Sequence, residues 1–481
     1  MSSAISAQRL RSLLPPLDGP GPAYRRLYEA IRLLLLDGRI SDGTRLPSER
    51  ELAVALGVSR TTSTRVVAEL RAAGLAESRR GSGTLVRLPP AASNVSSLLA
   101  DADDPDTIAL TYSAPVGPPG LARAFERAVD QLPGLLATTG YLPDGLPALR
   151  EALAQRYSDA GLPTEPDQII VTNGAMGAIS LTARTLLAPG ERVLTEGLSY
   201  PHGTDAFAAA GGRLSPMPVG ETPWDAEHVA TTLARGTHRT AYLVTDFHNP
   251  TAAVMDDATR QRLAALFRRH DVVPVIDESL RDINLDGIAV PAHFARHDPG
   301  AILLGSSSKG FWGGLRVGWL RAPRTLVMPL LQARMMDDMG TSAFDQLVLT
   351  ELLIDGEATA RAGRDRLRHG RDHLLTEVAR VLPEVRVERP AGGLNLWLTL
   401  PGRISSRLTS TAERRGLLLT PGPRFFTRAP QAGERHLRLP FTLAEDRLTE
   451  AVRRLRLALD DVSDGGGHTT ARAGDHIDLI A

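Results

Sequence analysis

The chain of 481 residues contains no cysteine. This absence excludes disulfides, thiolate metal sites, iron–sulfur clusters and cysteine nucleophiles. No apolar run approaches the ~20 residues of a membrane-spanning helix, and residues 1–20 lack the apolar block of a signal peptide. We therefore expect a cytoplasmic protein without a membrane partner. Hydrophobic residues make up 42% of the chain, enough for several folded domains with a large core.

Lysine is almost absent as well. Of the 55 basic residues, 54 are arginine, and Lys309 is the single lysine. Arginine replaces lysine wherever only charge matters, but a guanidinium group cannot act as an amine nucleophile. The remaining lysine is therefore either a remnant of compositional drift or a residue whose amine is needed.

The charge of the chain sums to zero but is unevenly distributed. Residues 1–90 hold fourteen Arg against eight Asp and Glu, so the rest of the chain is acidic by the same amount. A basic head on an acidic body is typical of proteins that bind DNA through the head.

The head has the pattern of a winged helix-turn-helix. Residues 24–38 form an amphipathic repeat. Ser48 and Ser59 each stand where a serine begins a helix, and Ser48 is followed by the glutamate of a capping box. Residues 75–88 alternate around a Gly-Ser-Gly turn, as in a β-hairpin. This order predicts a winged helix-turn-helix domain over residues 1–88.

The string LPSERELAVALGVSRTTSTRVVAELRAAGLAESRRGSGTLV resembles the GntR winged helix-turn-helix family over its whole length. The resemblance implies that the helix from Ser59 enters the major groove of double-stranded operator DNA, with the hairpin tip at the minor groove or the phosphate backbone. The alternative is a winged helix that docks proteins through a solvated basic face. The residues assigned to DNA are Ser48, Arg50, Ser59, Arg60, Thr61, Thr62, Thr64, Arg65, Arg79, Arg80, Gly81, Ser82 and Gly83.

Residues 89–107 mix proline, serine, alanine and aspartate with weak periodicity, which indicates a linker. Its DADDPD run lacks the glycine and the distal glutamate of a calcium loop, so a solvated acidic segment is expected.

The body, residues 108–462, has the pattern of an α/β domain. Short apolar runs alternate with helical segments, which predicts βαβ units and a mostly parallel sheet covered on both faces. Beyond about Gly356, arginine-rich helices and the strand-like LNLWLTL predict a smaller α+β subdomain, and residues 463–481 form a polar tail that we expect to be disordered. The seven strand-like runs are QIIVTNG, RVLTEG, RLSPMPV, AYLVTDF, VVPVIDE, AILLGSSS and RVGWLRA.

Lys309 and Asp277 both follow apolar runs of this body. Lys309 comes just after AILLG, and Asp277 directly follows VVPVI. Both side chains should therefore emerge at the carboxyl edge of the sheet, where open α/β sheets bind ligands. An amine that forms a Schiff base and a carboxylate that keeps a pyridinium nitrogen protonated are the two groups that pyridoxal phosphate requires. An aspartate at a strand end is, taken alone, more often a cap or an ion-pair partner.

The body also resembles fold type I aminotransferases from about Ile108 to Leu459, and a GntR head on such a body is similar to MocR-type regulators. The resemblance implies a Schiff base between Lys309 and the cofactor, and a homodimer. It assigns the effector carboxylate to Arg438 in HLRLPF. The other cofactor residues that it implies are Asp277 (pyridine nitrogen), Gly174, Ala175, Met176, Ser306 and Arg316 (phosphate), Tyr200 (ring face), Asn249 (ring oxygen) and Tyr141 (phosphate of the neighbouring subunit).

The sequence departs from this family pattern at two places. Ser279 and Leu280 stand where many relatives have a tyrosine that bonds the ring hydroxyl. Pro440 stands where relatives tend to have glycine, beside Arg438. The first change affects how the pKa of the Schiff base is tuned. The second affects the backbone around Arg438, and with it the effector site.

His369 and His373 have the spacing of a zinc pair on a helix, but Gly370 stands where the accompanying glutamate is expected. We expect surface histidines and no metal. The leading interpretation is a transcription regulator that senses pyridoxal phosphate or an amine or amino acid that reacts with it. The alternative is a working aminotransferase with an appended DNA-binding module. A regulator whose body has lost its cofactor is disfavoured because Lys309 is retained.

Overall fold

The chain forms two compact units, which are described one at a time. The first contains residues 1–96 and 117–127, and the second contains residues 97–116 and 128–481. The computed structural model describes residues 4–14, 17, 22–36, 40, 43–79, 83–87, 106–220 and 223–464.

The N-terminal unit is a winged helix-turn-helix, as predicted. Leu27, Ile31, Val66, Leu70 and Val86 are buried in its core. Both predicted helix starts are present, because the side chains of Ser48 and Ser59 accept backbone N–H groups of the helices that follow them. The elements are α1 (Ala7–Leu13), α2 (Ala23–Leu36), α3 (Glu49–Leu56) and α4 (Arg60–Ala72), with the antiparallel hairpin β1 (Ala76–Arg79) and β2 (Gly83–Val86).

The larger unit contains a seven-stranded sheet of order β4-β10-β9-β8-β7-β5-β6. Strand β10 runs antiparallel to both neighbours, and the remaining pairs are parallel. All seven predicted strand runs form strands of this sheet, so the predicted α/β fold class is confirmed. The strands are β4 (Ile169–Asn173), β5 (Arg192–Thr195), β6 (Arg213–Pro216), β7 (Thr240–Leu243), β8 (Val273–Asp277), β9 (Ile302–Ser306) and β10 (Val317–Arg321).

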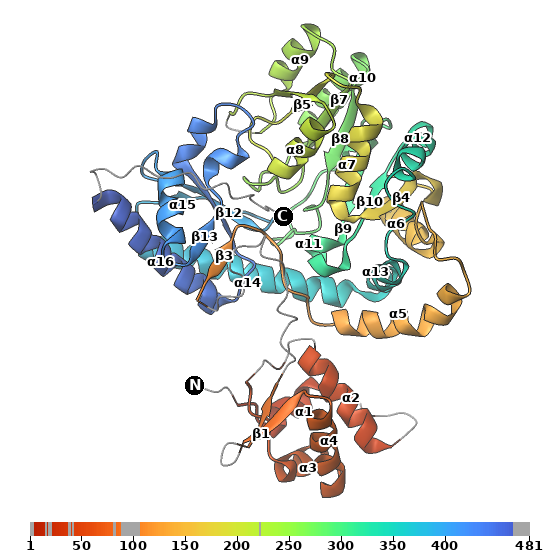
Figure 1. The fold of residues 1–481 in the computed structure, drawn as a ribbon, viewed down its shortest axis with the longest axis vertical. Coiled ribbons are helices and arrows are strands. Elements are labelled where there is room, and N and C mark those ends of the chain that lie inside the picture. Colours follow the sequence, from red (N-terminus) through yellow and green to blue (C-terminus); the bar gives the residue numbers. More distant parts are fainter. Residues whose placement is uncertain are drawn as a thin grey trace. The chain divides into compact units, whose positions relative to one another are not determined.

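Helices cover the faces of this sheet (Figure 1). Helix α7 packs on β4, β9 and β10, and the short α11 follows β9 directly. In chain order, the helices from residue 121 to residue 381 are α5 (Leu121–Leu136), α6 (Pro147–Asp159), α7 (Gly174–Leu186), α8 (Pro201–Ala209), α9 (Ala226–Ala234), α10 (Asp257–Arg269), α11 (Ser307–Gly310), α12 (Arg324–Arg334), α13 (Ala343–Asp355) and α14 (Glu357–Val381), with 3-10 turns η1 (Pro166–Gln168), η2 (Phe294–Arg296) and η3 (Gly313–Leu315). Of these, α5 begins in the first unit, and α14 packs on the smaller subdomain described next.

A smaller subdomain follows, built on an antiparallel sheet of order β11-β12-β14. Strand β13 pairs in parallel with β3, a three-residue strand from the start of the body, so the orange β3 lies among blue C-terminal elements in Figure 1. The last helix ends at Asp464, slightly beyond the predicted end of the domain. The elements are β3 (Ile108–Leu110), β11 (Arg386–Val387), β12 (Asn395–Thr399), α15 (Ser405–Glu413), β13 (Leu417–Leu419), η4 (Gly422–Phe425), η5 (Pro430–Arg435), β14 (His436–Pro440) and α16 (Glu445–Asp464).

This topology brings the ends of β8 and β9 together, because the two strands are parallel neighbours. Asp277 is the last residue of β8, and Lys309 lies in α11 immediately after β9. Among the described residues, no helix is long and apolar enough to cross a membrane.

Candidate functional site: a cofactor pocket and a DNA-reading helix

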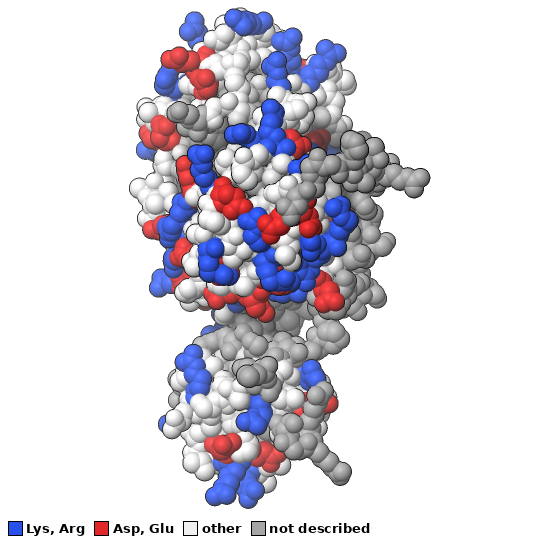
Figure 2. Space-filling model, turned by 90° about the vertical axis from the view of Figure 1, so that its left-hand side faces the viewer, with Lys and Arg blue, Asp and Glu red and all other residues white. Residues whose placement is uncertain are grey.

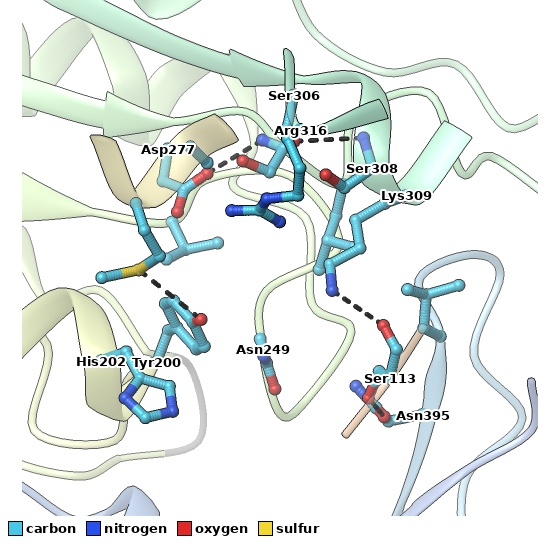
Figure 3. Close-up of a pocket in the computed structure, with 16 residues that line it drawn as sticks. Ser113, Tyr200, His202, Asn249, Asp277, Ser306, Ser308, Lys309, Arg316 and Asn395 are labelled. Carbon is cyan, nitrogen blue, oxygen red and sulfur yellow. Dashed lines mark hydrogen bonds between the residues drawn. The ribbon is translucent and has the colours of Figure 1, made fainter. Parts of the chain in front are cut away.

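A cavity of about 360 Å³ lies at the carboxyl ends of these strands, within the ~300–1,000 Å³ usual for small-molecule sites. Most of the residues that the sequence assigns to the cofactor line it, and Figure 3 shows the labelled ones around a common space. Gly174 and Tyr141 are not among the lining residues. The predicted residues that line the cavity are Ala175, Met176, Tyr200, Asn249, Asp277, Ser306, Lys309 and Arg316.

The amine of Lys309 is held in the cavity wall. Its Nζ donates a hydrogen bond to the backbone oxygen of Ser113 at 2.8 Å. Burial lowers the pKa of Lys309 to about 8, and the nearby positive charge of Arg438 acts in the same direction, while Asp277 opposes the shift. Because only the neutral amine is a nucleophile, this environment makes Lys309 far more reactive near neutral pH than a surface lysine.

Asp277 is fixed by two donors. The Tyr242 hydroxyl donates to Oδ2 at 3.0 Å, and the backbone N–H of Ser279 donates to Oδ1 at 2.9 Å. Burial raises the pKa of Asp277. Tyr242 comes from β7, and Gly203 gives its ring room, since a Cβ at position 203 would lie 2.3 Å from the Tyr242 hydroxyl. A carboxyl group held this way can accept the N–H of a pyridinium ring.

The turn from β4 into α7 forms an anion cradle. Helix α7 has thirteen residues and begins at Gly174, whose φ of +69° is one that side chains disfavour. A Cβ at Gly174 would lie 3.0 Å from Nη2 of Arg316, and one at Gly318 would lie 2.3 Å from the carbonyl carbon of Gly174. Backbone N–H groups at the start of a helix, beside a guanidinium group and the hydroxyl of Ser306, are suited to a phosphate.

Tyr200 and Asn249 complete the predicted ring site. Tyr200 immediately precedes α8, and its hydroxyl contacts Sδ of Met176 at 3.8 Å. Burial raises the pKa of Tyr200, so the phenol stays neutral. Within the described residues, the buried Oδ1 of Asn249 has no hydrogen-bond partner. A buried amide oxygen of this kind favours a ligand that brings a donor, such as the protonated ring oxygen of the cofactor.

Arg438 lies in the middle of β14 and is fully buried. One of its nitrogens, Nη2, donates to the backbone oxygen of Thr111. Its Nε and Nη1 have no partner within the part of the chain that the structure describes. Burial lowers the pKa of Arg438 to about 10, which leaves it charged at neutral pH. A buried guanidinium with unused donors is a strong site for a carboxylate.

Tyr141 lies on the surface, 66% exposed, and outside the cavity of its own chain. The N–H of Leu142, the next residue, donates to the oxygen of Met339, which places Tyr141 beside a second exposed apolar segment that includes the 87% exposed Met336. Its predicted role in a neighbouring subunit's phosphate site stays a prediction.

Of the histidine pair, His369 is exposed and His373 has a structural contact. His373 bonds the Thr449 hydroxyl at 2.8 Å, and a Cβ at Gly370 would lie 2.6 Å from the backbone oxygen of Phe441, so the helix packs too closely for a glutamate there. In the described ranges of the chain, no three His, Cys, Asp or Glu side chains are grouped so as to hold a metal.

The first turns of α4 form the candidate DNA-reading surface. Arg50, Arg60 and Thr61 are exposed, and Figure 2 shows basic groups on the viewed face of the N-terminal unit, with a few acidic ones among them. Ser59 caps α4 by accepting the N–H of Thr62 at 3.1 Å, while the hydroxyl of Ser48 donates to Glu51 in the capping box. Both serines therefore shape the helix starts.

Two further residues predicted to contact DNA make contacts within the head. The Thr64 hydroxyl donates to Glu49 at 2.6 Å, and the Arg65 guanidinium lies 3.7 Å from the centre of the Tyr24 ring. Gly83 begins β2 with a φ of +81°. The side chain of Arg79 and the predicted wing residues Arg80, Gly81 and Ser82 lie outside the described residues.

Sequence reasoning missed several residues of the site, some that line the cavity and one, Tyr242, that holds Asp277. Ser308 lies beside Lys309 in the same turn, so its position in SSSK was a usable signal. Ser113, Asn395 and Tyr242 carry no local signal, because they reach the pocket from segments that are distant along the chain.

Comparison with known proteins matches both units. Residues 130–455 match the family model of class I and II aminotransferases, and residues 23–86 match the gntR family of bacterial regulatory proteins. The uncharacterized HTH-type transcriptional regulator YisV of Bacillus subtilis is 28% identical over 83% of this chain and 89% of its own length. The probable rhizopine catabolism regulatory protein MocR of Rhizobium meliloti is 29% identical over 64% of this chain and 67% of its own length.

Aminotransferases also match a large part of the chain. The 2-aminoadipate transaminase of Thermus thermophilus is 32% identical over 67% of this chain and 80% of its own length. The crystal structure of LysN, an α-aminoadipate aminotransferase from the same organism, superposes with a TM-score of 0.67 at 28% identity, covering 75% of this chain and 94% of LysN. The predicted cofactor, pyridoxal phosphate, is the cofactor of this fold and of these homologues. The chain thus belongs to the class I and II aminotransferase family and, with its gntR-family DNA-binding head, is a transcription regulator of the MocR type.

Proposed function

We propose that the body of this regulator senses an amine or amino acid through pyridoxal phosphate at Lys309, and that the ligand changes the affinity of the head for operator DNA in the cytoplasm. Pyridoxal phosphate supplies an aldehyde that reacts with primary amines. The residues of the chain do the rest: they hold the phosphate, orient the ring and select the ligand.

The observation that carries this proposal is that Lys309 lies close enough to Arg438 to feel its positive charge. Arg438 is fully buried, Lys309 is half-buried in the cavity wall, and the charge of Arg438 contributes to the lowered pKa of Lys309. Nε and Nη1 of Arg438 have no partner among the described residues, so the guanidinium still has donors for a ligand carboxylate. An amine nucleophile beside a carboxylate-binding guanidinium suits an amino acid better than a simple aldehyde or amine.

The other groups of the pocket have distinct tasks. Asp277 holds the ring nitrogen, and the start of α7 with Arg316 and Ser306 holds the phosphate. Tyr200 covers a face of the ring, and Asn249 accepts a hydrogen bond from it. Because all of these groups lie on the larger subdomain while Arg438 lies on the smaller one, the ligand would bridge the two.

We further propose that the working unit is a homodimer. Tyr141, Leu136 and Met336 are 66%, 74% and 87% exposed, and such apolar exposure favours a protein interface. Two heads on one dimer also suit a DNA site with two half-sites. Sedimentation of the cofactor-loaded protein at micromolar concentration should show a dimer, and a pure monomer would contradict this part.

The test of the cofactor and sensing roles uses the full chain. Addition of pyridoxal phosphate should give a long-wavelength absorption band that borohydride fixes onto Lys309, as peptide mass analysis can show. A panel of amino acids should then be screened for changes in that band and in affinity for DNA upstream of the chain's own and neighbouring genes. A protein without any such band is not a pyridoxal phosphate sensor.

A second candidate function is transamination. The 32% identity to the 2-aminoadipate transaminase of Thermus thermophilus favours it, and Lys309 and Asp277 serve either role. Turnover of 2-aminoadipate or other amino donors with keto acids, in the presence of pyridoxal phosphate, separates the two candidates. Sustained turnover, together with a DNA affinity that does not change when amino donors are added, would favour transamination as the function.

A further inference from the structure

Residues 106–113, here called the pocket strap, contain β3 and end inside the cavity. The base of the strap is anchored to the smaller subdomain. Its strand pairs with β13, the N–H of Ile108 donates to the oxygen of Gly416 at 2.8 Å, and Arg447 donates to the oxygen of Thr107 at 2.6 Å. Ile108 and Leu110 are buried in the core of that subdomain. The base is therefore held by several independent contacts.

The far end of the strap is held differently. The backbone oxygen of Ser113 accepts the amine of Lys309, and the backbone oxygen of Thr111 accepts Nη2 of Arg438. These are the two side chains that the proposed function assigns to the cofactor aldehyde and to the ligand carboxylate. Figure 3 shows the amine of Lys309 turned toward Ser113 rather than toward Asp277. Two further bonds steady this end, from Ser113 to Asn395 and from Thr420 to the oxygen of Thr111.

A ligand would compete with both contacts. Once bonded to the aldehyde carbon of pyridoxal phosphate, the Lys309 nitrogen would have given up the hydrogens that it now offers to Ser113: one to solvent and two to the aldehyde oxygen, which would leave as water. A carboxylate that takes a planar pair of donors from Arg438 competes in the same way with the neutral oxygen of Thr111, and charged acceptors form the stronger bonds.

In both directions along the chain, the strap leads to segments of the first compact unit. Toward the N-terminus it continues into residues 88–105 and the DNA-binding domain. Toward the C-terminus it runs within four residues into residues 117–127, which belong to the same compact unit as the head. A displacement of residues 111–113 therefore reaches a segment that packs with the head, while the base of the strap stays in place.

We infer that residues 111–113 are a ligand-released segment that couples the pocket to the head: cofactor at Lys309 and carboxylate at Arg438 each displace a backbone oxygen of the strap. This inference rests on the proposed function and adds the element that transmits it. A ligand shifts the balance between two states only if it interacts with them unequally. Here the two states are the strap bound to Lys309 and Arg438 and the strap displaced from them, and the ligand favours the second.

The absence of cysteine from the chain allows a direct test. The side chains of Ser113 and Asn395 touch through a hydrogen bond, so Ser113→Cys with Asn395→Cys should form a disulfide that keeps the strap in the pocket. We expect the oxidised full-length protein to lose attachment of pyridoxal phosphate and the response of operator affinity. Reduction by a phosphine, removed before the assay, should restore both.

The matched control locks the base instead. Ala109 and Leu418 are register partners of β3 and β13, and Ala109→Cys with Leu418→Cys should leave attachment and response intact in the oxidised form. The single variants, treated with the same oxidant, control for oxidation itself. If the oxidised Ser113–Asn395 pair attaches the cofactor as fast as its reduced form, or if the base lock also blocks the response, the inference is wrong.

Hydrogen exchange of the unsubstituted protein gives an independent measurement that needs no variant to fold. On addition of pyridoxal phosphate, amides of residues 111–116 should exchange faster while those of Ile108 to Leu110 keep their protection. If exchange is unchanged in both segments while the absorption band is present, the inference about the strap is wrong, but the proposed function is not affected. If the unsubstituted protein forms no band, the proposed function itself fails, and the two failures are thereby distinguished.

Discussion

Arg60 and Thr61 lie on the exposed first turn of α4, whereas Lys309 lies half-buried in a cavity wall and Arg438 is fully buried in β14. On the head, water and salt screen each charge, so binding energy is shared among many modest contacts. In the body, burial lowers the pKa of Lys309 to about 8, and Arg438, which is fully buried and does not line the cavity itself, has donors without partners in the described structure. Replacing a single group of the ligand site should therefore abolish the response to ligand. Replacing a single group of the head should remove only part of the affinity for DNA.

The largest effect is expected at Lys309. Lys309→Arg keeps the positive charge but removes the amine nucleophile, so no borohydride-fixed product should form. Operator affinity without cofactor should stay near that of the unsubstituted protein, because the head is a separate folded unit. Titration of pyridoxal phosphate against DNA binding in both proteins checks this. If pyridoxal phosphate changed the DNA affinity of both proteins equally, Lys309 would not be the switch. The response would then not depend on a single group of the ligand site.

The second effect concerns Arg438. Arg438→Leu removes a buried cation whose carboxylate partner would be fully desolvated, so affinity for an amino acid ligand should fall by about 2–5 kcal/mol, roughly 30- to 5,000-fold. Binding of a simple alkylamine, followed by the change in the cofactor absorption, should be affected far less. The exposed Arg435→Leu is the control variant. Equal losses for the amino acid and the alkylamine would argue against a carboxylate site.

A third expectation follows from the direction in which the pKa of Lys309 is shifted. Burial lowers the pKa to about 8, so the neutral amine increases about tenfold per pH unit below pH 8 and levels off above it. The initial rate of cofactor attachment should follow this curve, a gain of roughly 50-fold between pH 6 and pH 8. The same reaction with a free alkylamine corrects for the ionisation of pyridoxal phosphate. A corrected rate that keeps rising to pH 10 would mean that the lysine is not desolvated.

How far the sequence predicts each region depends on how local the region is. The head is one continuous stretch, and its capping serines, three of its helices and its hairpin lie within residues 23–86, so pattern alone places them, although it does not predict α1. In the body, apolar runs place all seven strands and, through them, Asp277 and Lys309 at one edge. Ser113 and Tyr242 could not be found this way, since Ser113 acts through its backbone oxygen and Tyr242 looks like an ordinary strand residue. The three residues of β3 are too few to show a period.

A smaller effect is expected on the head. Arg60→Ala should cost about 1–3 kcal/mol of operator affinity if the side chain makes a bidentate base contact, roughly 5- to 150-fold in Kd. Arg65→Ala should cost less, because its guanidinium already stacks on Tyr24. Filter or fluorescence binding at several salt concentrations separates base contacts from phosphate contacts, which mainly change the salt slope. If Arg60→Ala left affinity unchanged at every salt concentration, α4 would not be the reading helix.

The smallest effect tests whether the capping serine shapes the reading helix or reads DNA itself. Ser59→Ala removes the acceptor for the N–H of Thr62 and should lower the local stability of α4 by about 1 kcal/mol, measured as faster amide exchange in its first turn. Ser59→Asp keeps the cap and favours the positive end of the helix dipole, but it adds a negative charge where phosphate is expected. Exchange should therefore stay slow in Ser59→Asp while operator affinity falls clearly, whereas in Ser59→Ala exchange should be fast and the loss of affinity small. Parallel changes in exchange and affinity across both variants would mean that helix stability, rather than surface charge, sets DNA binding, and the head would then depend on a single group as the pocket does.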